Sequence, residues 1–66
     1  MNISLKAARV NADYRQIDVA AILKVDKATI INWEKGRTAP KASQLKILSE
    51  LYMVPMDNIF LTHKPL

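Results

Sequence analysis

Four side chains between residues 27 and 32 have a spacing that could place them on one face of a helix. Lys27, Ala28, Ile31 and Asn32 stand at i, i+1, i+4 and i+5. A lysine can donate to O6 and N7 of guanine, and an asparagine can pair with N6 and N7 of adenine. Ala28 and Ile31 are apolar and could contact a thymine methyl group. The competing interpretation is a solvated helix face or, for Ile31, a contact with a second subunit.

Basic residues gather around this segment. The chain has ten Lys and Arg residues against six Asp and Glu, a net charge of +4. Between residues 15 and 41 lie six of these cations and three of the carboxylates. The excess favours a polyanionic partner, although a basic protein without such a partner would carry the same overall charge.

Helical periodicity dominates the chain. The apolar pattern predicts five helices, over residues 3–11, 16–23, 27–35, 42–52 and 55–60. We expect Asn2 and Asp26 to cap the first and third helices and Gly36 to end the third. Asp13, three residues before Gln16, has capping-box spacing for the second. No segment alternates strictly between apolar and polar residues, so no strand is predicted. The expected fold class is all-α, a compact five-helix domain in which helices 16–23 and 27–35 form a helix-turn-helix.

The apolar residues divide into a core and a surplus. The expected core or its edge comprises Leu5, Ala8, Tyr14, Val19, Ala20, Leu23, Ile30, Trp33, Leu45, Leu48, Leu51 and Tyr52. Met53, Met56, Ile59, Phe60 and Leu61 exceed what so small a core can bury, which predicts a dimer interface. The alternative is that these residues only cover the core of a single chain.

Several classes of protein are excluded by composition. The chain has no cysteine, one glycine and a single histidine, His63, without a carboxylate or nucleophile near it in sequence. Neither a phosphate-binding glycine loop nor a metal-ligand cluster is visible, so we predict no enzyme, no cofactor and no metal. The chain shows no secretion signal and no run of about 18 apolar residues, which predicts no membrane span and a cytoplasmic location. We expect one domain over residues 1–61 and a short tail over 62–66.

An ordered set of residues resembles the lambda-repressor/Cro-like helix-turn-helix family (xenobiotic-response-element type). The set is Ala8-Arg9, Gln16, Ala20, Val25, Thr29-Ile30, Trp33-Glu34, Gly36, Pro40 and the segment 54–60. The resemblance implies five helices, with 27–35 as the recognition helix and 16–23 lying across the DNA backbone. It also implies operator binding by homodimers.

The resemblance assigns roles to individual positions. Lys27, Ala28 and Asn32 match positions that contact bases, and Ile31 lies on the same face. The implied phosphate contacts are Arg15, Gln16, Thr29, Lys35, Arg37 and Thr38. Arg9 and Glu34 match a partly buried salt bridge between the first and third helices. Three residues depart from the family pattern: Asp13 replaces a common glycine, Arg15 a usual Ser or Thr, and Lys41 a usual capping residue.

We therefore predict a sequence-specific, double-stranded DNA-binding transcriptional regulator. The expected type is a phage, prophage or plasmid repressor that occludes a promoter as a homodimer. The alternatives are an antitoxin-like autoregulator with a toxin partner and a protein-interaction module that has lost DNA binding. A membrane-surface role would need a wide exposed apolar stripe, and no predicted helix shows one outside its core face.

Overall fold

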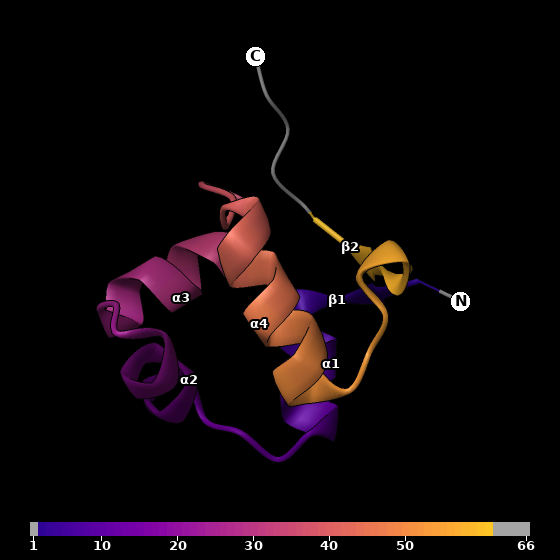
Figure 1. The fold of residues 1–66 in the computed structure, drawn as a ribbon. Helices are drawn as coiled ribbons and strands as arrows, with labels where there is room; N and C mark the ends of the chain where they lie inside the picture. The colour runs from indigo at the N-terminus through magenta and orange to yellow at the C-terminus, as the bar shows by residue number, and fades with distance from the viewer. Residues whose placement is uncertain (1, 62–66) are drawn as a thin grey trace.

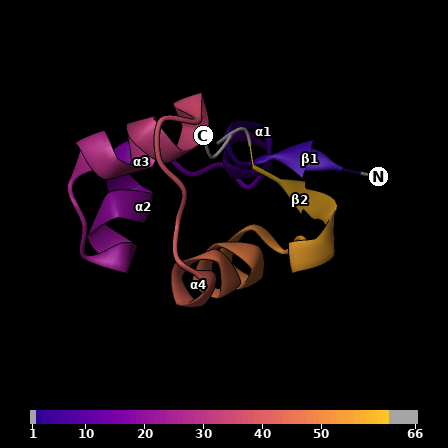
Figure 2. The ribbon, with the colours of Figure 1, turned by 90° about the horizontal axis from the view of Figure 1, so that it is seen from above.

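The structure is a computed structural model that describes residues 2–61. Its elements are β1 (Ile3–Ser4), α1 (Leu5–Asn11), α2 (Gln16–Leu23), α3 (Lys27–Lys35), α4 (Ala42–Tyr52), the 3-10 turn η1 (Met56–Asn58) and β2 (Ile59–Phe60). Helices α2 and α3 lie at one end of the molecule and the two strands at the other, with α1 and α4 between them (Figures 1 and 2). Within this range no helix has the length and hydropathy to cross a membrane.

The bounds of α2, α3 and α4 agree with those predicted from the sequence. Helix α3 begins after Asp26, whose carbonyl accepts from the amide of Thr29 at 2.9 Å. The Asp26 side chain makes no capping hydrogen bond within the described chain. Gly36 ends the helix with φ of 78°, a conformation that costs glycine little.

The start of α1 differs from the prediction. Ser4, and not Asn2, is the N-cap, and its Oγ accepts a hydrogen bond from the amide of Ala7 at 3.1 Å. Ile3 and Ser4 are extended and form β1. This strand pairs in parallel with β2, so that Ile3 lies opposite Ile59.

The predicted fifth helix is also wrong. Pro55 is followed by the single turn η1, in which the amide of Asn58 donates to the carbonyl of Pro55 at 2.9 Å. Asp57 and Asn58 are weak helix formers, whereas isoleucine and phenylalanine favour strands. Residues 2–61 therefore form a mostly helical fold, as predicted, but with four α-helices in place of five and a pair of two-residue strands.

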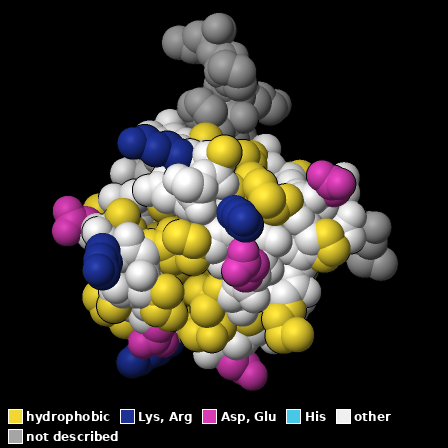
Figure 3. All heavy atoms as spheres, in the orientation of Figure 1, with side chains coloured by type: hydrophobic (Ala, Val, Ile, Leu, Met, Phe, Trp, Pro, Cys, Tyr) yellow, Lys and Arg dark blue, Asp and Glu magenta, His cyan; other side chains and the backbone are white. Residues whose placement is uncertain are grey.

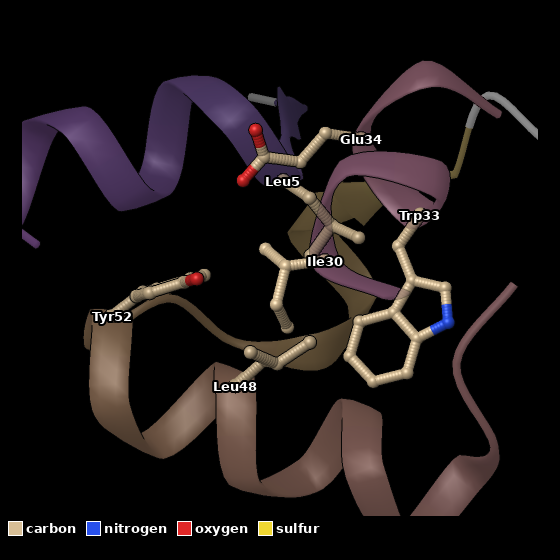
Figure 4. Close-up of a pocket in the computed structure, with 6 residues that line it drawn as sticks. All are labelled: Leu5, Ile30, Trp33, Glu34, Leu48 and Tyr52. Carbon is tan, nitrogen blue, oxygen red and sulfur yellow. The ribbon is translucent and has the colours of Figure 1, made fainter. Parts of the chain in front are cut away.

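The core draws on every helix. Its buried members are Leu5, Ala8, Val19, Ala20, Ile30, Trp33, Leu48, Tyr52 and Ile59. Ile30 and Trp33 of α3 meet Leu48 of α4, and the space between them leaves no room for a water molecule (Figure 4). The remaining predicted core residues lie partly buried at the edge: Tyr14, Leu23, Leu45 and Leu51. Packing against two other helices therefore fixes one face of α3 and leaves the opposite face to solvent.

Among residues 2–61, three residues other than glycine adopt the left-handed conformation: Asp13, Lys24 and Met53, with φ of 63°, 58° and 57°. Such a φ costs an ordinary residue about 1–2 kcal/mol. Met53 ends α4 and is 89% exposed, so it has little packing to lose. We expect Met53→Gly to be more stable than Met53→Ala by about 1 kcal/mol in urea unfolding, because only glycine relieves the strain. Equal stabilities would show that the left-handed backbone costs nothing here.

Candidate nucleic-acid interface

The turn between α2 and α3 sets the angle at which α3 is presented. Lys24 takes the left-handed conformation, and the amide of Val25 returns to the carbonyl of Ala20 at 3.0 Å. Val19 and Ala20 of α2 are buried in the core, and so is Ile30 of α3. The short turn and the small Ala20 let the two helices pack closely.

The four residues predicted to read bases lie on α3, although not with equal exposure. Lys27 and Ala28 are exposed in its first turn, whereas Ile31 and Asn32 are half-buried. The Oδ1 of Asn32 accepts a long hydrogen bond, 3.4 Å, from Nη1 of Arg37 at the surface. A contact of this length and exposure is weak and can give way to a better partner.

A polar network joins the first three helices. Nε of Arg9 lies 2.7 Å from Oε2 of Glu34, and Nη2 lies 3.2 Å from Oε1. The two side chains are only 11% and 5% exposed, so the salt bridge predicted for this pair is present and largely buried. Nη1 of Arg9 also donates to the carbonyl of Tyr14 at 2.9 Å, which ties down the loop before α2. The hydrogen bond from Arg9 to Glu34 raises the pKa of the guanidinium, which therefore stays charged.

Tyr52 lies at the edge of this network. Burial raises the pKa of its phenol to about 12, and the negative charge of Glu34 adds to the effect. The ring contacts Tyr14 at a centroid distance of 6.3 Å. Tyr52 therefore acts as a neutral packing residue at physiological pH.

Gln16, predicted to contact phosphate, is the second residue that bonds to Glu34. Its Nε2 donates to Oε1 of Glu34 at 3.1 Å. Gln16 also lines a hollow of about 200 Å³, whose other walls are Lys6, Ile31, Glu34 and Lys35. Ile31 thus lies beside the groups predicted to contact phosphate, and Lys6, which was not among the residues predicted for the site, also lines it.

Arg15 occupies the N-cap position of α2, so Asp13 is not the cap. An arginine side chain has no acceptor, and the cap is made in reverse, because Oδ2 of Asp18 accepts from the amide of Arg15 at 3.0 Å. The Arg15 guanidinium also pairs with Oδ1 of Asp18 at 3.0 Å and is 79% exposed. Hydrogen bonds from the Arg15 side chain and amide lower the pKa of Asp18. So exposed a pair is weak enough for Arg15 to turn toward another anion.

The same reversed cap begins α4. The amide of Lys41 donates to Oε1 of Gln44 at 2.8 Å, which replaces the capping side chain that lysine cannot supply. The lysine ammonium therefore stays exposed at the start of the helix.

The remaining residues predicted to contact phosphate belong to α3 and the loop that follows it. Lys35, Arg37 and Thr38 are exposed, and Thr29 is half-buried. The amide of Arg37 donates to the carbonyl of Asn32 at 3.0 Å and closes the end of the helix. The backbone after α3 is thus fixed, while the cationic side chains of Lys35 and Arg37 reach solvent.

Not all of the residues predicted to form a dimer interface are exposed on the surface of the single chain. Met56 and Phe60 are 37% and 45% exposed, and Leu61 is half-buried. Ile59 is 8% exposed and belongs to the core of the single chain, because the strand pairing turns it inward opposite Ile3. Its assignment to a dimer interface is therefore wrong. The predicted tail, 62–66, lies outside the described residues.

One face of the molecule carries a group of hydrophobic side chains. In Figure 3 they gather over the region between α2 and α4, while Lys, Arg, Asp and Glu appear around them as separate groups. Ile22 of α2 and Ile47 of α4 are 48% and 45% exposed. This face is unsuited to a polyanion, in contrast to the hollow with its two lysines.

Comparison with known proteins identifies the family. The helix-turn-helix family model matches residues 5–59, which include all four α-helices and η1. No curated protein and no solved structure gave a significant match. The geometry described above, with α2 supporting an outward α3, agrees with the family match. The chain belongs to the lambda-repressor/Cro-like helix-turn-helix family of DNA-binding transcription regulators.

Proposed function

We propose that the protein is a sequence-specific repressor that binds double-stranded DNA through α3. The observation that carries the proposal is the network of Arg9, Glu34 and Gln16, which braces α3 against α1 and α2. A braced helix holds Lys27, Ala28 and Asn32 in a fixed register, as base recognition requires. In this proposal these three residues meet base edges in the major groove, and Ile31 contacts the groove wall nearer the backbone.

The phosphate contacts come from both ends of the motif. Gln16 and Arg15 stand at the start of α2, where side-chain and main-chain donors suit a phosphate oxygen. Lys35, Arg37 and Thr38 lie at the far end of α3, and Thr29 would assist from within it. These contacts fix the position of the protein, and the α3 residues then supply the sequence preference.

Homodimer formation follows from size. A single small domain makes too few contacts for tight specific binding, so two copies would occupy half-sites about 34 Å apart. Met56 belongs to η1 and Phe60 to β2, and these elements lie at the end of the molecule away from α2 and α3 (Figure 1). The longest dimension is 29 Å, and two copies that meet at this end can separate their α3 helices by about that spacing.

The proposed biological role is that of a phage, prophage or plasmid repressor. With α3 in the major groove of an operator, the protein would repress by covering a promoter. Such a protein acts where the DNA is, in the cytoplasm.

The test is selection of binding duplexes from a random DNA library at near-physiological salt. We expect an enriched, palindrome-like site with half-sites about one helical turn apart. A single enriched half-site would contradict the dimer, and the absence of enrichment would contradict sequence-specific binding.

A second candidate function is supported by the apolar face between α2 and α4. Exposed Ile22 and Ile47 could dock a protein partner, as in an antitoxin-like autoregulator that binds a toxin. The same face would serve a protein-interaction module without DNA binding. Enrichment of an operator together with co-purification of a second protein would favour the autoregulator. Co-purification without enrichment would favour the interaction module.

A further inference from the structure

The residues that line the hollow between α1, α2 and α3 have a net positive charge. Two cationic residues, Lys6 and Lys35, line it together with the anionic Glu34. Arg9 neutralises the carboxylate of Glu34 through two contacts, of 2.7 and 3.2 Å. Neither lysine forms an ion pair with any carboxylate in residues 2–61. Two like charges that share one small space repel each other, and an anion between them would relieve the repulsion.

Helix geometry explains why Lys6 reaches this space. Lys6 and Arg9 stand at i and i+3 on α1 and so share one side of that helix. Because Arg9 is held against Glu34 of α3, the helix turns Lys6 toward the same region. Lys35 follows Glu34 directly and approaches the hollow from the opposite wall.

Gln16 gives the hollow a neutral donor with a fixed direction. A glutamine amide carries two N–H donors, of which one bonds to Oε1 of Glu34 at 3.1 Å. That bond orients the amide, and the second N–H can donate to a ligand in the hollow. At about 30 Å³ per water molecule, a volume of about 200 Å³ holds one phosphate group and a few waters.

We propose that this hollow seats a phosphate of the DNA backbone and that Lys6, which lies outside the helix-turn-helix, supplies one of its two cations. The inference rests on the proposed DNA binding and extends the DNA contact to α1. In this arrangement Gln16 and Lys35 hold the phosphate from α2 and α3, and Lys6 closes the third side. Glu34 is a positioning residue, because it orients Gln16 without contacting the phosphate.

The test compares Lys6→Ala with Lys46→Ala, which removes the same charge from an exposed position on α4, a helix that does not line the hollow. Affinity is measured by fluorescence anisotropy for the selected operator and for an unrelated duplex, over a range of salt concentrations. We expect Lys6→Ala to weaken both complexes alike, by about three- to tenfold, because a phosphate contact is independent of sequence. The slope of log K against log salt should fall by about 0.9 per subunit. Lys6→Arg should keep the slope.

The alternative outcomes are distinct. If the wild-type protein binds no duplex, the proposed function fails, and the phosphate seat with it. If the wild type binds DNA but Lys6→Ala behaves like Lys46→Ala, only the seat is overturned. A free anion is examined by titrating inorganic phosphate into the wild-type protein and following the Gln16 side-chain amide by NMR. A saturating shift at millimolar phosphate, with unchanged DNA affinity in Lys6→Ala, would reassign the hollow to a free anion.

Discussion

Replacing Glu34 with alanine should lower the free energy of unfolding by about 3–5 kcal/mol, because it strands a largely buried arginine without its counter-charge. The Arg9 side chain is only 11% exposed, and water cannot readily replace the lost carboxylate. Gln16 loses its acceptor in the same variant. A domain of 66 residues has a total stability of about 3–10 kcal/mol, so this single change removes much of it. Arg9→Ala should cost a similar amount, because it leaves the Glu34 carboxylate unpaired.

The measurement is urea unfolding followed by circular dichroism and by fluorescence of the single, buried Trp33. A double-mutant cycle with Arg9→Ala and Glu34→Ala should give a coupling energy above about 1 kcal/mol. The exposed pair Arg15 and Asp18 provides a matched cycle in the same molecule, where we expect about 0.2–1 kcal/mol. Additive losses at Arg9 and Glu34 would mean that the two residues stabilise the fold independently.

Apolar replacement of both residues separates charge from shape. Arg9→Met with Glu34→Leu removes both charges and keeps most of the volume, so the stability should recover relative to either alanine variant. Recovery will be partial, because the carbonyl of Tyr14 and the amide of Gln16 each lose a hydrogen-bond partner. The salt bridge therefore contributes fixed geometry for α3 as well as stability.

Local signals explain which helices could be predicted. The bounds of α3 follow from Asp26 before it and Gly36 after it, and those of α4 from its leucine periodicity and the Val54–Pro55 break. Each signal acts within a few residues of the helix end that it sets. The left-handed backbone at Asp13 likewise occurs where the family commonly has glycine.

The wrong predictions at the two ends of the described chain share a non-local cause. Ile3 and Ile59 pair from opposite ends of the described chain, and no local sequence pattern in either segment predicts this pairing. This pairing converts the expected start of α1 into β1 and the expected fifth helix into η1 and β2. It also buries Ile59, which sequence reasoning placed in a dimer interface.

The candidate site was predictable in its parts but not in its connections. The salt bridge between Arg9 and Glu34 could be predicted from the family resemblance, and the face of α3 proposed to contact bases from helical spacing. The bond from Gln16 to Glu34 and the hollow beside it depend on how three helices pack. The i, i+3 relation between Lys6 and Arg9 was the one signal in the sequence that could have drawn attention to Lys6.

The second large effect concerns the face of α3 that sequence reasoning assigned to base recognition. Lys27→Ala combined with Asn32→Ala should weaken binding to the selected operator by at least about 30-fold, because each base contact is worth about 1–3 kcal/mol. Binding to an unrelated duplex should change by less than about tenfold, because only one charge is lost. Competition binding against both duplexes measures the two affinities in one experiment.

The matched control is Asn11→Ala with Lys46→Ala, which removes the same two residue types from exposed positions on α1 and α4. It should leave both affinities within about twofold of the wild type, since neither residue lies on α3. Because Lys27 is exposed and Asn32 makes only a long bond to Arg37, the α3 variant should also fold normally. If both duplexes lost affinity equally, Lys27 and Asn32 would be contacting phosphates, and the sequence preference would have to come from other residues or from the shape of the DNA. Loss confined to the operator would assign base recognition to the face of α3 that the core packing leaves free.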